Sequence, residues 1–354
     1  MRNNQRDVSK FFERGIAILS FDAEQIWGYL DLLNEWGFRK QFPDTLAAYD
    51  KLLEAVCSAR ISATWFVVGG MSLSGSAGGN DPRMAGLPRH WTAFVPAGNE
   101  MTRPLWYRRP FVERIRDASP RQEIGLHGGL THLVWTDPRA TTESLEWELT
   151  EGIRALEQLS VVPRSFSYPR SQDAHIDLLP AHGIRCYRGR TPVLSYQLGR
   201  TLPGAILRML DELRAATPPP VWPEEVLPGL WNIPSSSFLY PIGTWRSRAV
   251  PLWTRVERFR RGLEAAARYR GIFHFCLHPA NLAESPGGFS MFHHMLERLA
   301  RARDRGDIEI LTVDEVASRV QNLRERAGLA DISTKDVPAG NTNERATAIR
   351  EIRG

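Results

Sequence analysis

The sequence predicts an α/β fold in which a mainly parallel sheet, closed or open, carries helices on its outside. Short runs of β-branched and aromatic residues alternate with longer amphipathic segments along most of the 354 residues. Such alternation is typical of parallel strands joined by crossover helices. Four segments rich in metal-compatible or acid–base side chains also follow predicted strands. Parallel-sheet proteins place their functional side chains at these strand ends.

The individual elements follow from apolar periodicity. Strands are expected near 15–21, 61–68, 122–127, 163–168, 184–187, 229–233, 271–277 and 307–311. Helices are expected near 44–58, 109–118, 141–158, 174–182, 253–269 and 290–305. The last two show apolar residues at three- and four-residue spacing, which predicts a core-facing stripe. The residues of these stripes are Val256, Phe259, Leu263 and Ala266, and Phe292, Met295, Leu296 and Leu299.

Residues 1–328 are predicted to form one domain with two insertions. Residues 71–103 are rich in Gly, Ser and Pro and contain Trp91 and Phe94. Residues 189–228 contain a short helix, around 205–213, followed by Thr217-Pro218-Pro219-Pro220. Long loops in a compact domain are usually lids, binding loops or disordered segments, and we expect these two to flank the site. Residues 329–354 lack apolar periodicity and are expected to be a flexible tail.

Composition excludes several classes of protein. The chain has 42% hydrophobic and 24% charged residues, which is ordinary for a globular protein in water. It has no apolar run of about 18 residues, so a membrane-spanning helix is not expected. Met1 to Arg14 are polar and charged, without the apolar centre of a signal peptide, which favours a cytoplasmic location. The three cysteines are scattered and odd in number, which indicates reduced thiols. They include no CxxC pair, so a structural zinc-thiolate site is not expected.

The formal charge of +5 raises the question of nucleic-acid binding. Only four basic residues are lysines, and the arginines are spread along the chain without a long block. We interpret them mainly as solvated surface charges, so no nucleic-acid partner is expected. Attraction of an anionic substrate or a lipid headgroup is the alternative.

The first candidate segment carries two carboxylates at the end of a buried strand. Asp22 and Glu24 follow the apolar run Ile16 to Leu19. One carboxylate can bind a metal ion while the other takes a proton from an attacking water. The residue types alone leave open which of the two binds the ion.

Histidines mark two further strand ends. His127 and His132 flank the Gly128-Gly129 turn. Two imidazoles and one carboxylate form a zinc site that leaves a position open for water. His278 precedes Pro279, and a histidine with a pKa near neutrality can protonate a leaving amine. His274 is the alternative for that role.

The fourth segment, Tyr168-Pro169-Arg170, follows another predicted strand. An arginine there can orient a carboxylate or stabilise an oxyanion. An ordinary surface arginine is the competing interpretation.

Taken together, these segments resemble the motifs of the polysaccharide deacetylase (NodB-homology) family, in the same order. Four of them are those described above, and Ala63 to Gly69 resembles the family's second strand. The remaining motif is the apolar–tryptophan segment Gly229-Leu230-Trp231-Asn232-Ile233-Pro234. The resemblance spans roughly residues 15–315 and implies a distorted (β/α)₇ barrel that uses a divalent metal, usually zinc.

The resemblance also implies roles for single residues. Asp22 is expected to be the general base, His278 the general acid and Arg170 a further catalytic residue. Glu24, His127 and His132 are expected to bind the metal, and Tyr168 and Trp231 to contact the substrate. The sequence departs from the family at three points. Asp22-Ala23-Glu24 replaces adjacent aspartates, the histidines are five residues apart instead of four, and Ser167 stands at the usual arginine position.

The implied reaction is removal of an N-acetyl or N-formyl group from an amino sugar or glycan, free or carried on a lipid or nucleotide. Two alternatives remain. The barrel could be a carbohydrate-binding protein that has lost the metal. It could also be a related hydrolase that acts on an O-acetyl ester or on a cyclic ureide such as allantoin.

Overall fold

The centre of the fold is strand β1 (Gly15–Ala23), all nine residues of which are buried. It pairs in parallel with β11 (Ile272–Leu277) on one side and with β2 (Thr64–Val67) on the other. A further strand, β12 (Ile308–Ile310), pairs with the beginning of β1. The apolar run that predicted β1 is explained by this central position, since a strand covered on both faces is apolar throughout.

These strands belong to a computed structural model that describes residues 12–30, 32–199, 201–240, 249–284 and 287–326. The predicted tail at 329–354 and most of the polar segment Met1 to Arg14 lie outside the described residues.

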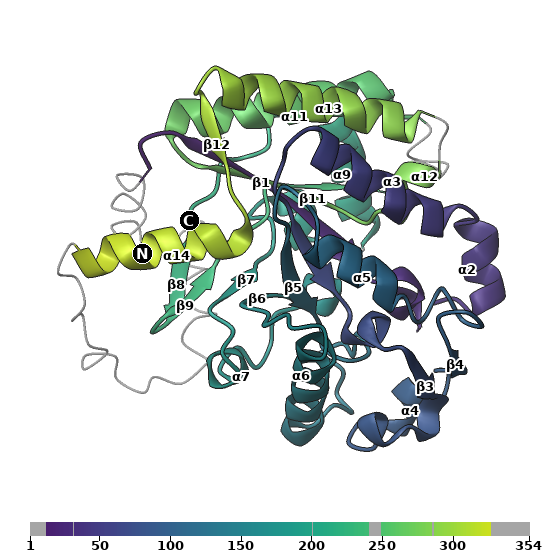
Figure 1. Ribbon diagram of the computed structural model, residues 1–354. Helices are drawn as coiled ribbons and strands as arrows, with labels where there is room; N and C mark the ends of the chain where they lie inside the picture. Colours follow the sequence, from purple (N-terminus) through teal and green to yellow (C-terminus); the bar gives the residue numbers. More distant parts are fainter. Residues whose placement is uncertain (1–11, 31, 200, 241–248, 285–286, 327–354) are drawn as a thin grey trace.

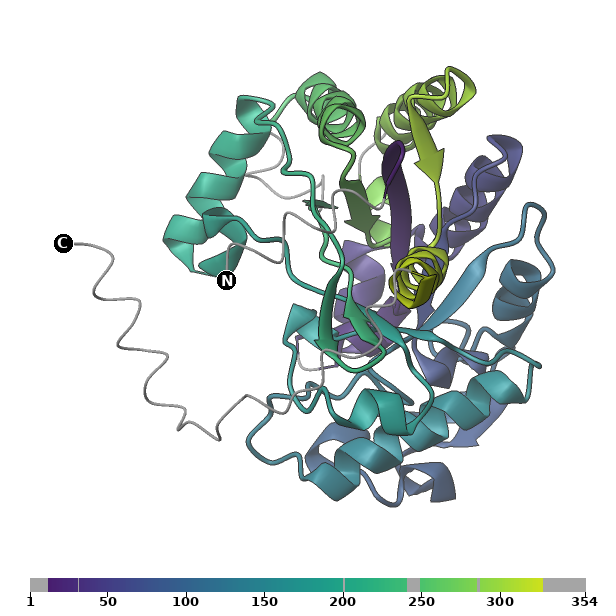
Figure 2. The same ribbon diagram turned by 90° about the vertical axis from the view of Figure 1, so that its left-hand side faces the viewer.

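The sheet continues in parallel from β2 through β5 (Glu123–His127), β6 (Ser165–Ser167) and β7 (Cys186–Arg188) to β9 (Leu230–Asn232). The order β11-β1-β2-β5-β6-β7-β9 therefore contains seven consecutive parallel strands. Beyond it, β10 (Ser237–Leu239) adds to β11, and β8 (Glu224–Leu227) pairs antiparallel with β9. The sheet curls into a barrel that is not fully closed (Figures 1 and 2).

Helices cover the outside of this sheet, as predicted. Figure 1 shows α11 (Leu252–Tyr269) and α13 (Gly288–Asp304) packed side by side. The other predicted helices are α3 (Thr45–Ser58), α5 (Arg109–Arg116), α6 (Thr142–Glu157), α7 (Leu178–Ala181) and α9 (Leu202–Leu213). Of these, α7 is a single turn instead of the helix expected over 174–182.

All eight predicted strands are present, but several short elements were not predicted. They are α2 (Glu35–Gln41), α4 (Arg89–Thr92), α8 (Leu194–Gln197), α12 (Ala280–Ala283), the strands β8 and β10, and the 3₁₀ turns η2 (Gln25–Tyr29), η3 (Gly69–Ser72), η4 (Gly78–Asn80), η5 (Pro82–Met84) and η6 (Pro169–Ser171). The insertion 71–103 also contains a small hairpin of β3 (Gly75–Ala77) and β4 (Ala97–Asn99). Elements of three to five residues are too short for a periodic pattern to stand out.

Alternation along each strand divides the interior into two cores. Ala17, Leu19 and Phe21 of β1 pack in the larger core, together with apolar residues of the outer helices. Ile16 and Ile18 point the other way, into the barrel. Since successive residues of a strand face opposite sides, Ser20 and Asp22 lie on the same barrel face as Ile16 and Ile18.

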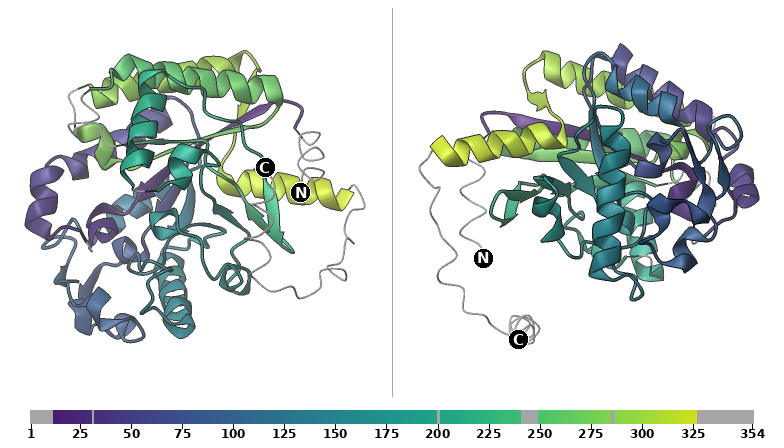
Figure 3. Two further views of the ribbon diagram at one scale, coloured as in Figure 1. Left: turned by 180° about the vertical axis from the view of Figure 1, so that it is seen from behind. Right: turned by 60° about the horizontal axis from the view of Figure 1, so that its bottom comes forward.

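The unpredicted helix α14 (Val313–Arg326) packs at the amino-terminal ends of the strands. Its valines share the barrel core with Ile16. The backbone N–H groups of Val313 and Asp314 donate to Thr64 Oγ1 and Glu123 Oε2, at the beginnings of β2 and β5. Figure 3 shows α14 from two further sides. Because α14 occupies this end, the opposite, carboxyl end of the barrel is where a site can form. Both insertions begin at that end, after β2 and β7.

Within the described ranges, no helix combines the length and apolarity needed to cross a membrane.

Candidate metal centre

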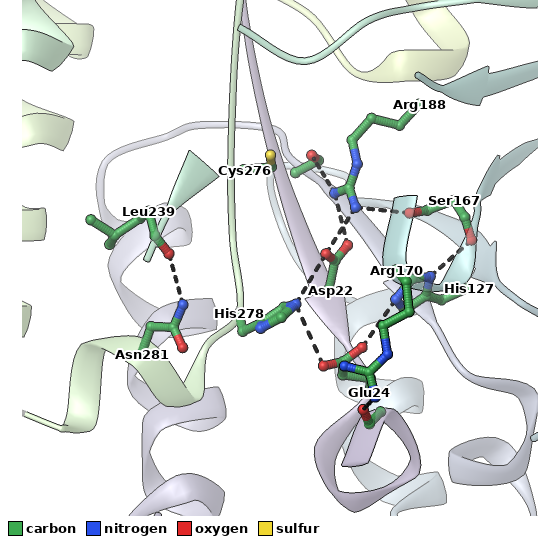
Figure 4. Close-up of polar contacts among 12 residues, drawn as sticks. Asp22, Glu24, His127, Ser167, Arg170, Arg188, Leu239, Cys276, His278 and Asn281 are labelled. Carbon is green, nitrogen blue, oxygen red and sulfur yellow. Dashed lines mark hydrogen bonds and ion pairs between the residues drawn. The ribbon is translucent and has the colours of Figure 1, made fainter. Parts of the chain in front are cut away.

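Strand alternation brings polar side chains from several strands together at the carboxyl end of the barrel. Asp22 follows Ile16 and Ile18 on the inner face of β1, and His127 ends β5. Ser167 and Arg188 end β6 and β7, where they are paired in register. Figure 4 shows these side chains pointing toward one another. Four strands thus each contribute a polar group to one small volume.

Glu24, His127 and His132 form a group whose ligating atoms all lie within 4.8 Å of one another. Glu24 Oε2 is 3.1 Å from Nε2 of each histidine. All three residues are at most 4% exposed. The structure therefore brings together the three residues that were expected to bind the metal.

Glu24 reaches the histidines because the turn after β1 leaves room for its carboxylate. It precedes the short 3₁₀ turn η2, and Trp27 N–H donates to its backbone carbonyl. Gly28 packs against the Glu24 carboxylate, and a Cβ at Gly28 would lie only 2.1 Å from Glu24 Cδ. Any larger residue at position 28 would displace the carboxylate.

The hydrogen bond of His127 fixes its tautomer in a form that suits metal binding. Nδ1 lies 2.8 Å from the Ser167 carbonyl oxygen, which can only accept, so Nδ1 carries the proton. Nε2 is therefore the ring nitrogen that faces the Glu24 carboxylate and is left to bind an ion. A backbone hydrogen bond on the second ring nitrogen is common in metal-binding histidines.

His132 is held in an unfavourable backbone conformation. Its φ of 76° lies in the left-handed region, which costs a non-glycine residue about 1–3 kcal/mol. Neither ring nitrogen makes a well-aligned hydrogen bond to another described residue. Burial lowers the pKa of His132 to about 4, so the ring is neutral at physiological pH. A buried neutral imidazole without a good partner is suited to binding a metal ion.

Asp22 is paired with Arg188, a residue that sequence reasoning did not select. Arg188 Nη1 is 2.7 Å from Asp22 Oδ1, and Nη2 donates to Oδ2 at 2.8 Å. Nη2 also donates to Ser167 Oγ at 2.8 Å. Burial by itself would raise the pKa of Asp22, but the Arg188 guanidinium holds it well below its usual range. Asp22 is therefore a carboxylate at any working pH.

His278 lies just beyond β11, between the two carboxylates. Its Nε2 is 3.4 Å from Asp22 Oδ2 and 3.4 Å from Glu24 Oε1. Burial would lower the pKa of His278, but the negative charges of Glu24 and Asp22 raise it above its ordinary value. Its side chain is 24% exposed, against 4% and 6% for the two carboxylate side chains. His278 is thus the most accessible member of the group.

His274, the alternative acid, is buried in a hydrogen-bonded chain. Its Nδ1 donates to the Pro234 carbonyl at 3.2 Å, so Nε2 accepts from the Ser20 hydroxyl at 2.8 Å. Arg188 in turn donates to Ser20 Oγ at 3.2 Å. Burial lowers the pKa of His274 to about 3. A neutral histidine with both nitrogens engaged has no proton available for a substrate.

Of the three other predicted residues, Arg170 lies beside the centre and two lie away from it. Arg170 donates from Nη2 to the Gly28 carbonyl at 3.1 Å and lies near enough to His132 to contribute to its lowered pKa, but Arg188 occupies the position on Asp22. Tyr168 is 1% exposed and packs edge-on against Trp135, Phe166 and Tyr187. Trp231 is 7% exposed and donates to Gln321 of α14, at the opposite end of the barrel. Neither aromatic ring offers an open surface for a sugar.

Comparisons with known proteins support the fold. No protein-family model matches the sequence, and no curated protein does. Among solved structures, a protein from Mycobacterium smegmatis classed as a polysaccharide deacetylase matches with a TM-score of 0.56 and 17% identity, over 88% of this chain and 92% of that one. One from Pseudomonas aeruginosa PAO1, classed likewise, matches with a TM-score of 0.55 and 9% identity, over 87% and 91%.

A third solved structure, that of Puue allantoinase, matches equally well. Its TM-score is 0.56 at 10% identity, over 87% of this chain and 90% of that one. The predicted distorted (β/α)₇ barrel, and the resemblance to the polysaccharide deacetylases at the level of the fold, are therefore confirmed. Since proteins named for different substrates share this fold, the reaction has to be argued from the side chains.

Proposed function

We propose that this protein is a metal-dependent hydrolase that removes an N-acetyl or N-formyl group from an amino sugar or glycan precursor. The observation that carries the proposal is the buried group of Glu24, His127 and His132, with Asp22 and His278 beside it. One carboxylate and two imidazoles suit a divalent ion, of which zinc is our choice, and leave coordination positions open. The two neighbouring groups are an ionised carboxylate and a histidine with a raised pKa.

These neighbours can supply the proton transfers that amide hydrolysis needs. An ion held by the three ligands would supply Lewis acidity for activating water and polarising the scissile carbonyl. Asp22, kept ionised by Arg188, accepts the proton of the attacking water. His278, whose pKa the two carboxylates raise, donates a proton to the nitrogen of the leaving amine. Two groups whose pKa values are pushed apart in this way are suited to the roles of base and acid.

Position favours Glu24 over Asp22 as the carboxylate ligand. Glu24 faces both imidazoles, whereas the Asp22 carboxylate is bound by the two-pronged guanidinium of Arg188. A carboxylate with both oxygens on an arginine has less capacity left for an ion. This assignment leaves Asp22 as the base.

An amide hydrolase acting on a cyclic ureide is the second candidate, because the allantoinase structure matches as well as the deacetylase structures. Ring opening of a cyclic ureide also needs an activated water and a protonated leaving nitrogen. The two candidates therefore share the centre and differ in the substrate. An N-acylated amino sugar or glycan precursor remains our preferred substrate.

Metal analysis and a substrate panel test the proposal. We expect about one divalent ion per purified chain, and release of acetate or formate from an N-acylated amino sugar that stops after chelation and resumes when Zn²⁺ is restored. His127→Ala should lose the ion. His90→Ala is the matched control, because His90 pairs with Asp137 outside the site and its loss should leave the ion bound.

The panel should contain N-acetyl and N-formyl amino sugars, an O-acetylated sugar and allantoin. Hydrolysis of allantoin alone would replace the deacetylase assignment by the ureide one. A chain that binds sugars without metal and without turnover would favour the carbohydrate-binding interpretation.

A further inference from the structure

The loop that joins the two histidine ligands is bound by a buried glutamate of helix α6. Glu148 Oε1 accepts from the backbone N–H groups of Thr131 at 2.8 Å and Leu133 at 3.0 Å. Both carboxylate oxygens lie 3.1 Å from the Thr131 hydroxyl. Glu148 is 0% exposed. One carboxylate therefore fixes the backbone on either side of His132.

The same loop is held from its other side by the turn after β2. The N–H groups of Gly69 and Gly70 donate to the carbonyls of Gly129 and Leu130, each at 2.7 Å. The N–H of Leu130 donates to the backbone carbonyl of Glu148 at 3.0 Å. The loop 128–133 is thus bound on one side by η3 and on the other by α6.

Helix α6 comes this close because two glycines face each other. A Cβ on Gly129, whose φ is 155°, would lie 2.5 Å from Glu148 Cγ. A Cβ on Gly152 would lie 2.5 Å from the carbonyl carbon of Gly129. Without these glycines the carboxylate of Glu148 could not reach the amides of the loop.

Glu148 is not part of an ordinary ion pair. Within the described ranges its carboxylate has no cationic partner, and its hydrogen-bond donors all belong to the loop. Taking a carboxylate out of water without a counter-charge is unfavourable unless several donors replace the solvent. The hydrogen bonds from the loop therefore compensate for the burial of the Glu148 carboxylate.

We propose that Glu148 is a positioning residue of the metal centre. His127 and His132 are five residues apart, so the loop must bulge for both rings to face Glu24. The bulge is seen in the left-handed φ of His132. Since Glu148 binds the amides before and after His132, it selects this conformation. This inference rests on the metal site proposed above.

Metal affinity is the direct test. Glu148→Leu keeps the approximate size but removes both acceptors, and Glu148→Gln keeps one oxygen that can accept the two N–H bonds. The matched control is Glu151→Leu, since Glu151 lies on the same helix, is also buried and pairs with Arg154. Zn²⁺ affinity would be measured by competition with a chelator, and the visible spectrum of the Co²⁺ form would report ligand geometry. Circular dichroism would confirm folding.

Loss of a group that orients a metal ligand typically weakens metal binding by about 10–100-fold. We expect a loss of that order and an altered Co²⁺ spectrum for Glu148→Leu, a change of about threefold or less for Glu148→Gln, and no change for Glu151→Leu. A folded Glu148→Leu variant with the affinity and spectrum of the unmodified protein would overturn the inference. So would a Glu148→Gln variant that loses as much affinity as Glu148→Leu.

Three further outcomes are decisive. If Glu148→Leu does not fold, Glu148→Asp replaces it, because the shorter side chain keeps the charge but draws the carboxylate away from the backbone N–H groups of Thr131 and Leu133. Unchanged affinity would then overturn the inference, and weakened affinity would support it. If the unmodified chain binds neither ion, the proposed function fails and this inference fails with it. If the unmodified chain binds the ions and the folded Glu148→Leu variant binds them equally well, this inference alone fails.

Discussion

Replacing Arg188 by methionine should disable Asp22 without removing a metal ligand. Arg188 and Asp22 are 5% and 3% exposed, and the guanidinium makes two short contacts to the carboxylate. Removing one partner of a buried ion pair typically destabilises a protein by about 3–5 kcal/mol, because the other charge remains buried without compensation. We expect a loss of this order in the free energy of unfolding at neutral pH.

The same change should shift the pH dependence of activity. In the unmodified protein the folded-state pKa of Asp22 lies below its unfolded value of about 3.9. The pair therefore stabilises the fold above that pH and loses its effect as the pH falls through the folded pKa. Without Arg188, burial is less opposed and the pKa of Asp22 rises, at about 1.4 kcal/mol per unit. A protonated Asp22 cannot accept the proton of water.

For Arg188→Met we therefore expect kcat/KM to fall by about 10²–10⁴ near neutrality. The acidic limb of the pH profile should move to higher pH. The profile would be measured between pH 4 and 9, with metal content determined for each preparation. Arg188→Lys should lie in between, because lysine keeps the charge but not the two-pronged geometry.

Arg185→Met is the matched control. Arg185 lies just before β7, is exposed, and pairs with Asp314 at the other end of the barrel. Its loss should leave the profile unchanged. A folded Arg188→Met enzyme with an unshifted acidic limb would refute the role given to Arg188.

Other side chains of the centre and its surroundings can be tested separately. Asp22→Asn and His278→Ala should each lower kcat by about 10²–10⁴ with bound metal retained, and a fully active His278→Ala would move the acid role to solvent. In the insertion 71–103, Phe94 is 68% exposed, so Phe94→Ala should change KM for the sugar while leaving the melting temperature close to that of the unmodified protein; identical kinetics on every substrate would argue against a binding role. The pKa of His274 is about 3 in the folded protein and about 6.5 in the unfolded chain. Below pH 6.5 the unfolded chain therefore binds a proton that the folded protein does not, and the free energy of unfolding decreases as the pH falls. Between pH 8 and pH 5 this amounts to about 2 kcal/mol, which denaturant unfolding of His274→Gln should show as a smaller acid loss; an equal loss in both proteins would contradict it.

The strands of the sheet could be predicted from the sequence because their signals are local. A buried parallel strand such as β1 is an apolar run, and the carboxyl ends of such strands meet at one end of a barrel. Asp22, Glu24 and His127 could therefore be expected to lie together from the sequence alone. The 3₁₀ turn that aims Glu24 at the histidines was not predictable, because it depends on Gly28 packing against the carboxylate.

Helix α14 was not predicted, for a different reason. Its apolar residues, such as Val316 and Val320, face the barrel core and not the outer layer, and its first turn is bound by Thr64 and Glu123. The spacing of Val313, Val316, Ala317 and Val320 does indicate a helix, but its partners are far away in the sequence, so its position in the fold could not be predicted. The consequence is functional, since α14 closes the end of the barrel opposite the candidate centre.

Strand register, and not a sequence motif, determines that Arg188 is the arginine that pairs with Asp22. Arg170 was selected because it adjoins Pro169, yet Ser167 stands where the resemblance places an arginine. In the sheet, Ser167 is paired with Arg188 of the next strand, and the Arg188 guanidinium passes Ser167 Oγ to reach Asp22. A small side chain on one strand thus leaves room for a long one on its neighbour. The sequence contained one sign of this arrangement. Cys186 and Arg188 are two residues apart on one strand, so their side chains must lie on the same face of the sheet. Recognising it required knowing that β6 and β7 are adjacent, and that pairing is a property of the fold.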